Sequence, residues 1–581
     1  MRSPYGSRCD TDRVLRALTV GICLLVGTSH AASERFDRFK QYLATNINLD
    51  GMAGLHGEGY YTTADDDRRP PATGRLTLTP TLNVLNLFTL SADVMISTDE
   101  SYARQDMSVL GLHPTWKWGK AHIGDYTESL SKYSFNGVNV KGLELDLFPA
   151  KWRFTLGGGR TQRAVSGDIT TRAFAQYLVA GRVGYGERNG NYVDIVVLKV
   201  RDDPGSLDDV VLDTTGQVNP DTLITELDTI WQNPPENPYA VTPQENLVGG
   251  ITGQLSLWRR RIVLGAELCG SAFTRDLGAA KVDASEVGVP DAAADLFESM
   301  YTTRTSTVAD YALSTKAALN LPMVRADIGY NVVGPGYVSL GASSTANDRR
   351  QLTLNASGNV KTTRLQVGYS FMADNLAGQE TSTNTRNQLR ASVSSTLKKW
   401  QSQYGANYLT LNNDASVDSL GWDYDNLTLN TYQGIAFGRD LLLRQIGLQY
   451  TYQTSRKDMN ADITRSNYHT SSLAASLRFI KLLTLNLNAG LSYRDPEQGD
   501  SYLTQVYGGR LAISVFENRW SNALSVNSSM VRETRVIRAG LTSSYRFTKA
   551  GQVGLNISYN RFNGSRFFEE LRGTLSVTHR L

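Results

Sequence analysis

From residue 47 to the end of the chain, apolar and polar residues alternate one by one along most segments. In Gly74–Asn83, the leucines and Pro80 occupy the even positions, and threonines stand between them. Leu483–Asn488 alternates Leu with Thr and Asn in the same way. Because successive side chains of a strand point to opposite faces, this pattern predicts strands with one apolar and one polar face.

The alternating segments are long for strands of a soluble protein. They run for about 10 to 15 residues, whereas soluble sheets favour strands of about five or six. A strand that crosses a membrane needs about 9–11 residues. Segment length therefore favours strands that span a membrane.

Short turns and longer loops alternate between the segments. The longer, more polar connections include Tyr61–Thr73, Arg163–Thr171 and Ser455–Thr464. Twelve short turns and thirteen longer loops predict about 26 strands, within two, from Ile47–Tyr61 to Phe567–Leu581. We expect the short turns at Val84–Asn86, Trp118–Lys120, Phe148–Lys151, Glu187–Gly190, Trp258–Arg261, Asn320–Pro322, Asn359–Lys361, Lys398–Trp400, Phe437–Asp440, Phe479–Lys481, Phe516–Arg519 and Phe547–Gly551.

Tryptophans concentrate at one end of this meander. Of the eight in the chain, five stand beside short turns: Trp118, Trp152, Trp258, Trp400 and Trp520. Tryptophan favours the interface between membrane and water. We therefore predict that these five side chains form an interfacial girdle at the end of the short turns.

The first 46 residues have a different pattern. A basic leader precedes the apolar stretch Ala17–Val26, and small residues follow at Ser29 and Ala31. This order is typical of a secretory signal peptide, which we place at residues 1–31. Residues 32–46 then form a short periplasmic segment with an amphipathic helical pattern, and residues 47–581 form the stranded body.

Composition excludes several other classes of protein. Hydrophobic residues make up 41% of the chain and charged residues 20%, and after the leader no apolar run approaches the roughly 18 residues of a membrane helix. The 28 tyrosines argue against disorder. A net charge of +3 indicates no general attraction to nucleic acid.

Four features can be compared with known classes of protein: the leader, the alternating strands, the short turns with longer loops, and the final apolar positions Leu575, Val577 and Leu581. With these features the chain resembles a Gram-negative outer-membrane β-barrel of the porin-like class. The resemblance implies an all-β, up-and-down antiparallel transmembrane barrel in the cell outer membrane, with periplasmic short turns and extracellular loops. It also implies outer-membrane lipid and the barrel-assembly machinery as partners. No motif identifies one specific family.

Two connections on the loop side are much longer and strongly acidic, at residues 202–245 and 276–303. The first contains ten Asp or Glu and neither Lys nor Arg. A barrel of this width cannot be filled by the side chains of its wall, and we expect only these two segments to be long enough to narrow it. Folded inward, they would favour cations; the alternative is a solvated external loop. The candidate selectivity residues are Asp202, Asp203, Asp208, Asp209, Asp213, Asp221, Glu226 and Asp228.

Catalytic and metal-binding motifs are weak. His469 and Ser471, with Asn467 nearby, have the spacing of outer-membrane phospholipases, but the surrounding pattern of that family is absent. The six histidines show no metal-ligand spacing on one strand, and only Cys269 follows the leader. We find neither a phosphate-binding loop nor a haem-attachment motif. We therefore expect no enzyme, no cofactor and no metal.

Two functions fit these features. The first is a channel that passes small hydrophilic solutes, with a preference for cations set by the acidic loops. The second is a sheath or scaffold that holds a periplasmic protein partner, such as a multihaem cytochrome, in the outer membrane.

Overall fold

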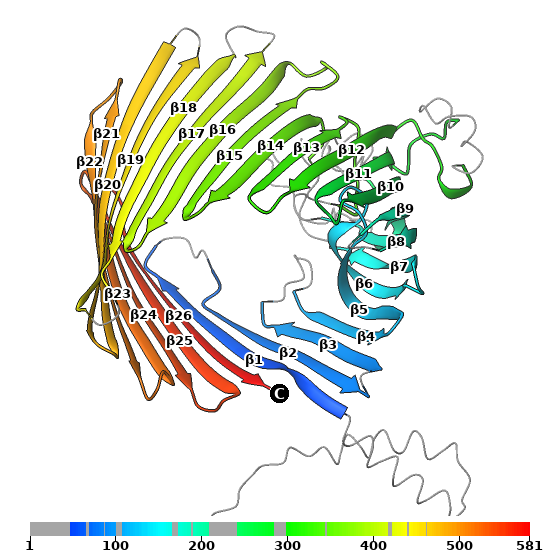
Figure 1. Cartoon of the computed structure of the whole chain (residues 1–581). Coiled ribbons are helices and arrows are strands. Elements are labelled where there is room, and N and C mark those ends of the chain that lie inside the picture. Colours follow the sequence, from blue (N-terminus) through cyan, green and yellow to red (C-terminus); the bar gives the residue numbers. More distant parts are fainter. Residues whose placement is uncertain are drawn as a thin grey trace, which may run out of the picture.

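The computed structural model is a ring of strands that follow one another in chain order (Figure 1). It describes residues 47–64, 69–85, 87–99, 107–165, 172–187, 190–207, 241–283, 298–342, 346–415, 421–438, 441–459 and 462–581. Within these ranges, no helix has the length and apolar character needed to cross a membrane.

Twenty-six strands form one sheet, and a 3-10 turn, Pro204–Ser206, follows β9. The strands are β1 Ile47–Thr62, β2 Ala72–Val84, β3 Phe88–Ser97, β4 Val109–Trp116, β5 Gly119–Ser129, β6 Asn136–Leu147, β7 Trp152–Gln162, β8 Ala175–Gly186, β9 Tyr192–Asp203, β10 Glu245–Leu257, β11 Ile262–Thr274, β12 Thr307–Asn320, β13 Val324–Val333, β14 Arg349–Val360, β15 Thr363–Asp374, β16 Ser382–Leu397, β17 Trp400–Ala415, β18 Trp422–Ala436, β19 Leu443–Met459, β20 Asp462–Ile480, β21 Leu483–Pro496, β22 Tyr502–Val515, β23 Trp520–Val531, β24 Thr534–Arg546, β25 Gly551–Asn563 and β26 Phe567–Arg580.

The sheet closes on itself. Each strand pairs antiparallel with the next, and β1 pairs with both β2 and β26. Leu55, for example, lies opposite Leu76 on one side and Val577 on the other. Closure leaves no open sheet edge with unpaired backbone groups. The predicted 26-stranded antiparallel barrel is confirmed. Each of the twelve predicted short turns lies at the junction of two consecutive strands, and several overlap the strand ends by one or two residues.

The two faces of the wall differ in character, as β9 shows. Its residues Val193, Ile195 and Val197 are 49%, 55% and 39% exposed. The alternate positions, Val196 and Leu198, are almost fully buried. The first set lies on the outer face of the barrel and the second on the inner face, so the period of two that the sequence displays separates outside from inside.

The five predicted girdle residues all lie at the short-turn end of the barrel. Trp118 and Trp258 lie in turns, whereas Trp152, Trp400 and Trp520 are the first residues of their strands. All five side chains are exposed. Trp152 packs edge-on against Tyr185 of the neighbouring strand.

Several sequence predictions fall outside the described residues. These are the signal peptide at 1–31, the segment at 32–46, and the acidic residues Asp208, Asp209, Asp213, Asp221, Glu226 and Asp228.

Candidate functional site

Two short connections fold into the lumen and cover part of the inner wall. Residues 130–135 join β5 to β6, and residues 334–342 follow β13. Their side chains share one buried apolar cluster with the inner face of β5, β6 and β8–β13. Its members are Tyr126, Leu130, Tyr133, Phe135, Val140, Leu178, Ala180, Val196, Leu198, Val200, Val248, Cys269, Ala312, Val333 and Tyr337.

Side-chain hydroxyls of one inward segment bond to the backbone of the other. The Tyr337 hydroxyl donates to the carbonyl of Tyr133 at 2.9 Å, and Ser339 Oγ donates to the carbonyl of Ser134 at 2.7 Å. Burial raises the pKa of the Tyr133 hydroxyl to about 12 and that of Tyr337 further. Both phenols are therefore protonated and act as neutral groups at physiological pH.

Polar groups of the wall fasten each segment. Asn246 accepts a hydrogen bond from Leu340 N and donates one to the carbonyl of Val338, both at 3.0 Å. The carboxylate of Glu267 accepts hydrogen bonds from the backbone N–H groups of Lys132 at 3.2 Å and Tyr133 at 2.8 Å. Asn246 is fully buried. Because buried polar groups are costly when unpaired, these contacts specify the inward position of both segments.

The covered inner wall should contribute more stability than the outer wall. We expect Leu198→Ala to lower the free energy of unfolding by about 3 kcal/mol, since it leaves a cavity under the inward segments. Ile195→Ala, in the same strand on the outer face, should cost clearly less. Urea titration of the barrel in lipid vesicles measures both values. Equal losses would show that the inner layer is not packed as described.

A belt of buried ion pairs lies on the inner wall nearer the short turns. Arg153 contacts Asp194 at 2.5 Å, and Arg182 contacts Asp146 at 2.8 Å. Thr155 Oγ1 also donates to Asp146, at 2.7 Å. Each of these cations is nearly inaccessible and has an acidic partner, as buried charges require.

Another part of the inner wall, from β14 to β25, is polar and carries arginines. Four of them each stand next to an exposed Leu or Tyr that faces outward, so the alternation of the strand directs the arginines into the lumen. On this face of β15–β25 the carboxylates Asp374 and Asp462 stand at strand ends. The four arginines and their neighbours are Arg364 with Leu365, Arg390 with Leu389, Arg494 with Tyr493, and Arg510 with Leu511.

The lumen-facing side chains of this wall bond to one another along β16 and across to β17. Arg390 and Arg386 both donate to Gln388 Oε1, at 2.8 and 3.3 Å. Gln388 in turn donates to Asn407 Oδ1 at 2.7 Å. The lining thus presents a chain of ordered polar groups, of the kind that lines hydrophilic pores.

Of the predicted selectivity residues, the structure describes two. Asp202 is buried near the end of β9, where its carboxylate accepts hydrogen bonds from Gln176 Nε2 and Gln244 N, both at 2.9 Å. Asp203 caps the 3-10 turn by accepting from Gly205 N at 3.0 Å. In these positions both carboxylates bond to the protein itself.

One expectation is wrong. The acidic segments at 202–245 and 276–303 are not the only connections able to narrow the lumen, because residues 130–135 and 334–342 fold inward despite their shorter length. The composition of these two loops could have indicated their inward fold. These loops carry Leu130, Tyr133 and Phe135, and Tyr337, Val338 and Leu340, where an exposed loop would carry polar residues.

The residues with phospholipase spacing are arranged differently from a catalytic pair. A ring nitrogen of His469, Nδ1, bonds to the hydroxyl of Tyr450 at 2.9 Å. Asn467 accepts from the hydroxyl of Tyr452 at 3.3 Å. Between His469 and Ser471 we find no hydrogen bond in the described part of the chain.

Comparison with known proteins identifies no family. No family model matches the chain, and no curated protein matches its sequence. Among solved structures, the P pilus usher (PapC) translocation pore is 11% identical with a TM-score of 0.32, covering 92% of this chain and 99% of its own. The siderophore receptor PirA of Pseudomonas aeruginosa is 11% identical with a TM-score of 0.39, covering 91% and 80%. OpdK of the same organism, solved with vanillate, is 11% identical with a TM-score of 0.30, covering 58% and 93%.

Proposed function

We propose that the chain is an outer-membrane channel that passes small hydrophilic solutes. The observation that carries the proposal is the polar inner wall of β14–β25, lined by Arg364, Arg390 and Arg510, inside a closed barrel of 26 strands. A wall of this circumference cannot fill its own lumen with side chains. Water and small polar solutes are the contents that such a lining accommodates.

The outer face supports a place in a membrane. Exposed apolar side chains such as Ile195, Val367 and Leu389 cover it on strands all round the ring. In water so large an apolar surface would drive aggregation, whereas in lipid it is the favoured exterior of a barrel. The outer membrane of a Gram-negative cell, reached by a signal peptide and the barrel-assembly machinery, is the location that we propose.

The two inward segments narrow the channel on one side. They cover the inner face of β6 and β8–β13 and leave the polar wall opposite them to line the path. On one side, solutes would therefore pass the two inward segments, which pack against apolar residues of the wall. On the other side they would pass the hydrogen-bonding groups of the polar wall.

Charge preference has two opposing sources in this proposal. The acidic segments 202–245 and 276–303 would attract cations if they reach the path, and the arginines of the wall attract anions. Deleting Ser206–Tyr239 should therefore move the reversal potential in the anion-selective direction. The reversal potential is measured with the protein in planar bilayers under a salt gradient. An unchanged potential would assign selectivity to the wall alone.

The girdle makes the membrane location testable. Variants that retain a single tryptophan at position 118, 152, 258, 400 or 520 should all be quenched by the same depth class of lipid-attached quencher, near one interface. Fluorescence quenching in vesicles measures the depth. Quenching at widely different depths would contradict the orientation of the barrel in the membrane.

Solute passage is tested with the purified protein in liposomes. We expect proteoliposomes to swell in solutions of small sugars and amino acids at rates that fall as solute size increases. Liposomes that contain heat-denatured protein are the control. Swelling no faster than in the control would contradict the channel and would favour a sheath whose lumen is filled by a periplasmic partner.

A further inference from the structure

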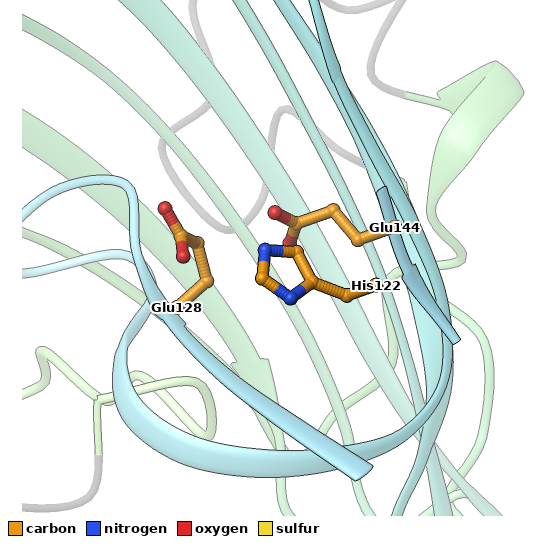
Figure 2. Close-up of side chains that lie close together, drawn as sticks. All are labelled: His122, Glu128 and Glu144. Carbon is orange, nitrogen blue, oxygen red and sulfur yellow. The ribbon is translucent and has the colours of Figure 1, made fainter. Parts of the chain in front are cut away.

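Three side chains that bind metals in other proteins converge on the inner wall, beside the belt of ion pairs. Ligand atoms of His122, Glu128 and Glu144 all lie within 4.8 Å of one another. Figure 2 shows the imidazole ring of His122 between the side chains of Glu128 and Glu144. His122 and Glu128 come from β5, and Glu144 comes from β6.

The register of the sheet places two of the three ligands. His122 and Glu144 are direct partners across the β5–β6 ladder, and both side chains face the lumen. Glu144 is only 1% exposed. A Cβ at Gly157 would lie 2.9 Å from Cβ and Cγ of Glu144, so glycine at this position leaves the space that the carboxylate occupies.

A sharp bend of β5 supplies the third ligand. Lys120 Nζ contacts both carboxylate oxygens of Glu128 at 3.1 Å, although eight residues of straight strand would span roughly 26 Å. The strand bends at Gly124, which has a φ of +91°, and its register shifts between Thr127 and Ser129. A side chain at Gly124 would also collide with the carbonyl of Leu110 at 2.2 Å.

A chain of hydrogen bonds orients the imidazole of His122. His113 Nε2 contacts Asp93 Oδ2 at 3.2 Å, and His113 Nδ1 contacts His122 Nδ1 at 2.7 Å. Because the bond to Asp93 takes the hydrogen of His113, the remaining hydrogen between the two rings belongs to His122 Nδ1. His122 Nε2 then presents a bare lone pair towards the carboxylates, which is the tautomer that binds metals.

Two of the converging atoms lack a partner. Both His122 Nε2 and Glu144 Oε1 are buried, and neither has a hydrogen-bond partner among the residues that the structure describes. In the adjoining belt, Lys120 pairs with Glu128, Arg182 with Asp146 and Arg153 with Asp194. No cation forms an ion pair with Glu144 among the described residues, and a buried carboxylate oxygen facing a nitrogen lone pair is unfavourable unless a proton or a metal ion lies between them.

We propose that His122 Nε2, Glu128 and Glu144 bind a divalent transition-metal ion of the zinc type. One imidazole nitrogen and two carboxylate oxygens are a donor set that Zn²⁺ accepts, with a water in the fourth position. The Asp93–His113 pair is the outer shell that fixes the ligand tautomer. The inference depends on the fold of β4–β6 and is independent of whether the barrel passes solutes.

Bound metal would also fasten the inward segment. Glu128 lies two residues before Leu130, where the segment that covers the lumen begins. An ion that joins Glu128 to His122 and Glu144 therefore ties this end of the segment to the wall. A metal that binds only the folded barrel stabilises it against unfolding.

Isothermal titration of the purified, chelator-treated full-length barrel with ZnCl₂ tests the site. We expect one Zn²⁺ per chain and a rise in the thermal unfolding temperature. Glu144→Gln, which preserves the shape of the side chain, should weaken binding by at least about tenfold and abolish the thermal rise. Asp93→Asn should weaken binding about tenfold while leaving the three ligands in place.

His469→Gln is the matched control, because His469 lies on β20, far along the chain from this site. It should bind Zn²⁺ as the native protein does. Absence of binding to the native barrel would overturn the proposal, as would equal binding by the native protein and Glu144→Gln. Loss of binding in His469→Gln alone would place the metal elsewhere and would overturn it equally.

Discussion

Replacing residues 335–342 with a short Gly-Ser linker should raise the single-channel conductance about twofold or more. This segment is one of the two that cover the inner wall, and its partner at 130–135 loses the hydrogen bonds from Tyr337 and Ser339 when it is removed. Both changes widen the path. Planar bilayer recordings of the variant and the native protein in the same salt give the comparison.

A second loop serves as the control for that deletion. Residues 497–501 join β21 to β22 at the same end of the barrel and are exposed. Shortening this loop should leave conductance unchanged. Equal conductance of the native protein and the 335–342 variant would mean that the inward segment does not border the solute path.

Neutralising the arginines of the lumen should shift ion selectivity towards cations. The variant Arg364→Gln, Arg386→Gln, Arg390→Gln removes three positive charges from neighbouring strands of the polar wall. Under a salt gradient its reversal potential should move in the cation-selective direction. The shift should shrink as salt rises, because the Debye length falls from about 10 Å at 0.1 M to about 3 Å at 1 M.

The turn between β10 and β11 offers a control with the same change in net charge. Arg259, Arg260 and Arg261 lie there, outside the lumen wall. Changing all three to Gln should leave the reversal potential where it is in the native protein. If both triple variants shift it equally, the effect comes from net charge and not from the lining.

The architecture could be predicted from sequence because it depends on local patterns. Alternation with a period of two sets each strand, and turn residues such as Asn320 and Lys361 set the ends. Each strand pairs with its neighbour in the chain, so connectivity requires no long-range information. The count of 26 strands follows from adding these local units.

The lumen could be predicted only in part, because its contents depend on register and bending. His122 and Glu144 are 22 positions apart and meet as cross-strand partners, which spacing on one strand cannot reveal. Glu128 reaches them only because β5 bends at Gly124. Apolar residues such as Phe135 and Leu340 in the loops indicate that these segments fold inward. Loop length alone does not indicate it.

The most direct test of the central claim is the current through the purified native protein in a planar bilayer. If the polar wall borders an aqueous path that residues 130–135 and 334–342 narrow, the current should show discrete and stable steps of uniform size. A folded protein that inserts into the bilayer, shows β-sheet circular dichroism and passes no current would contradict the account.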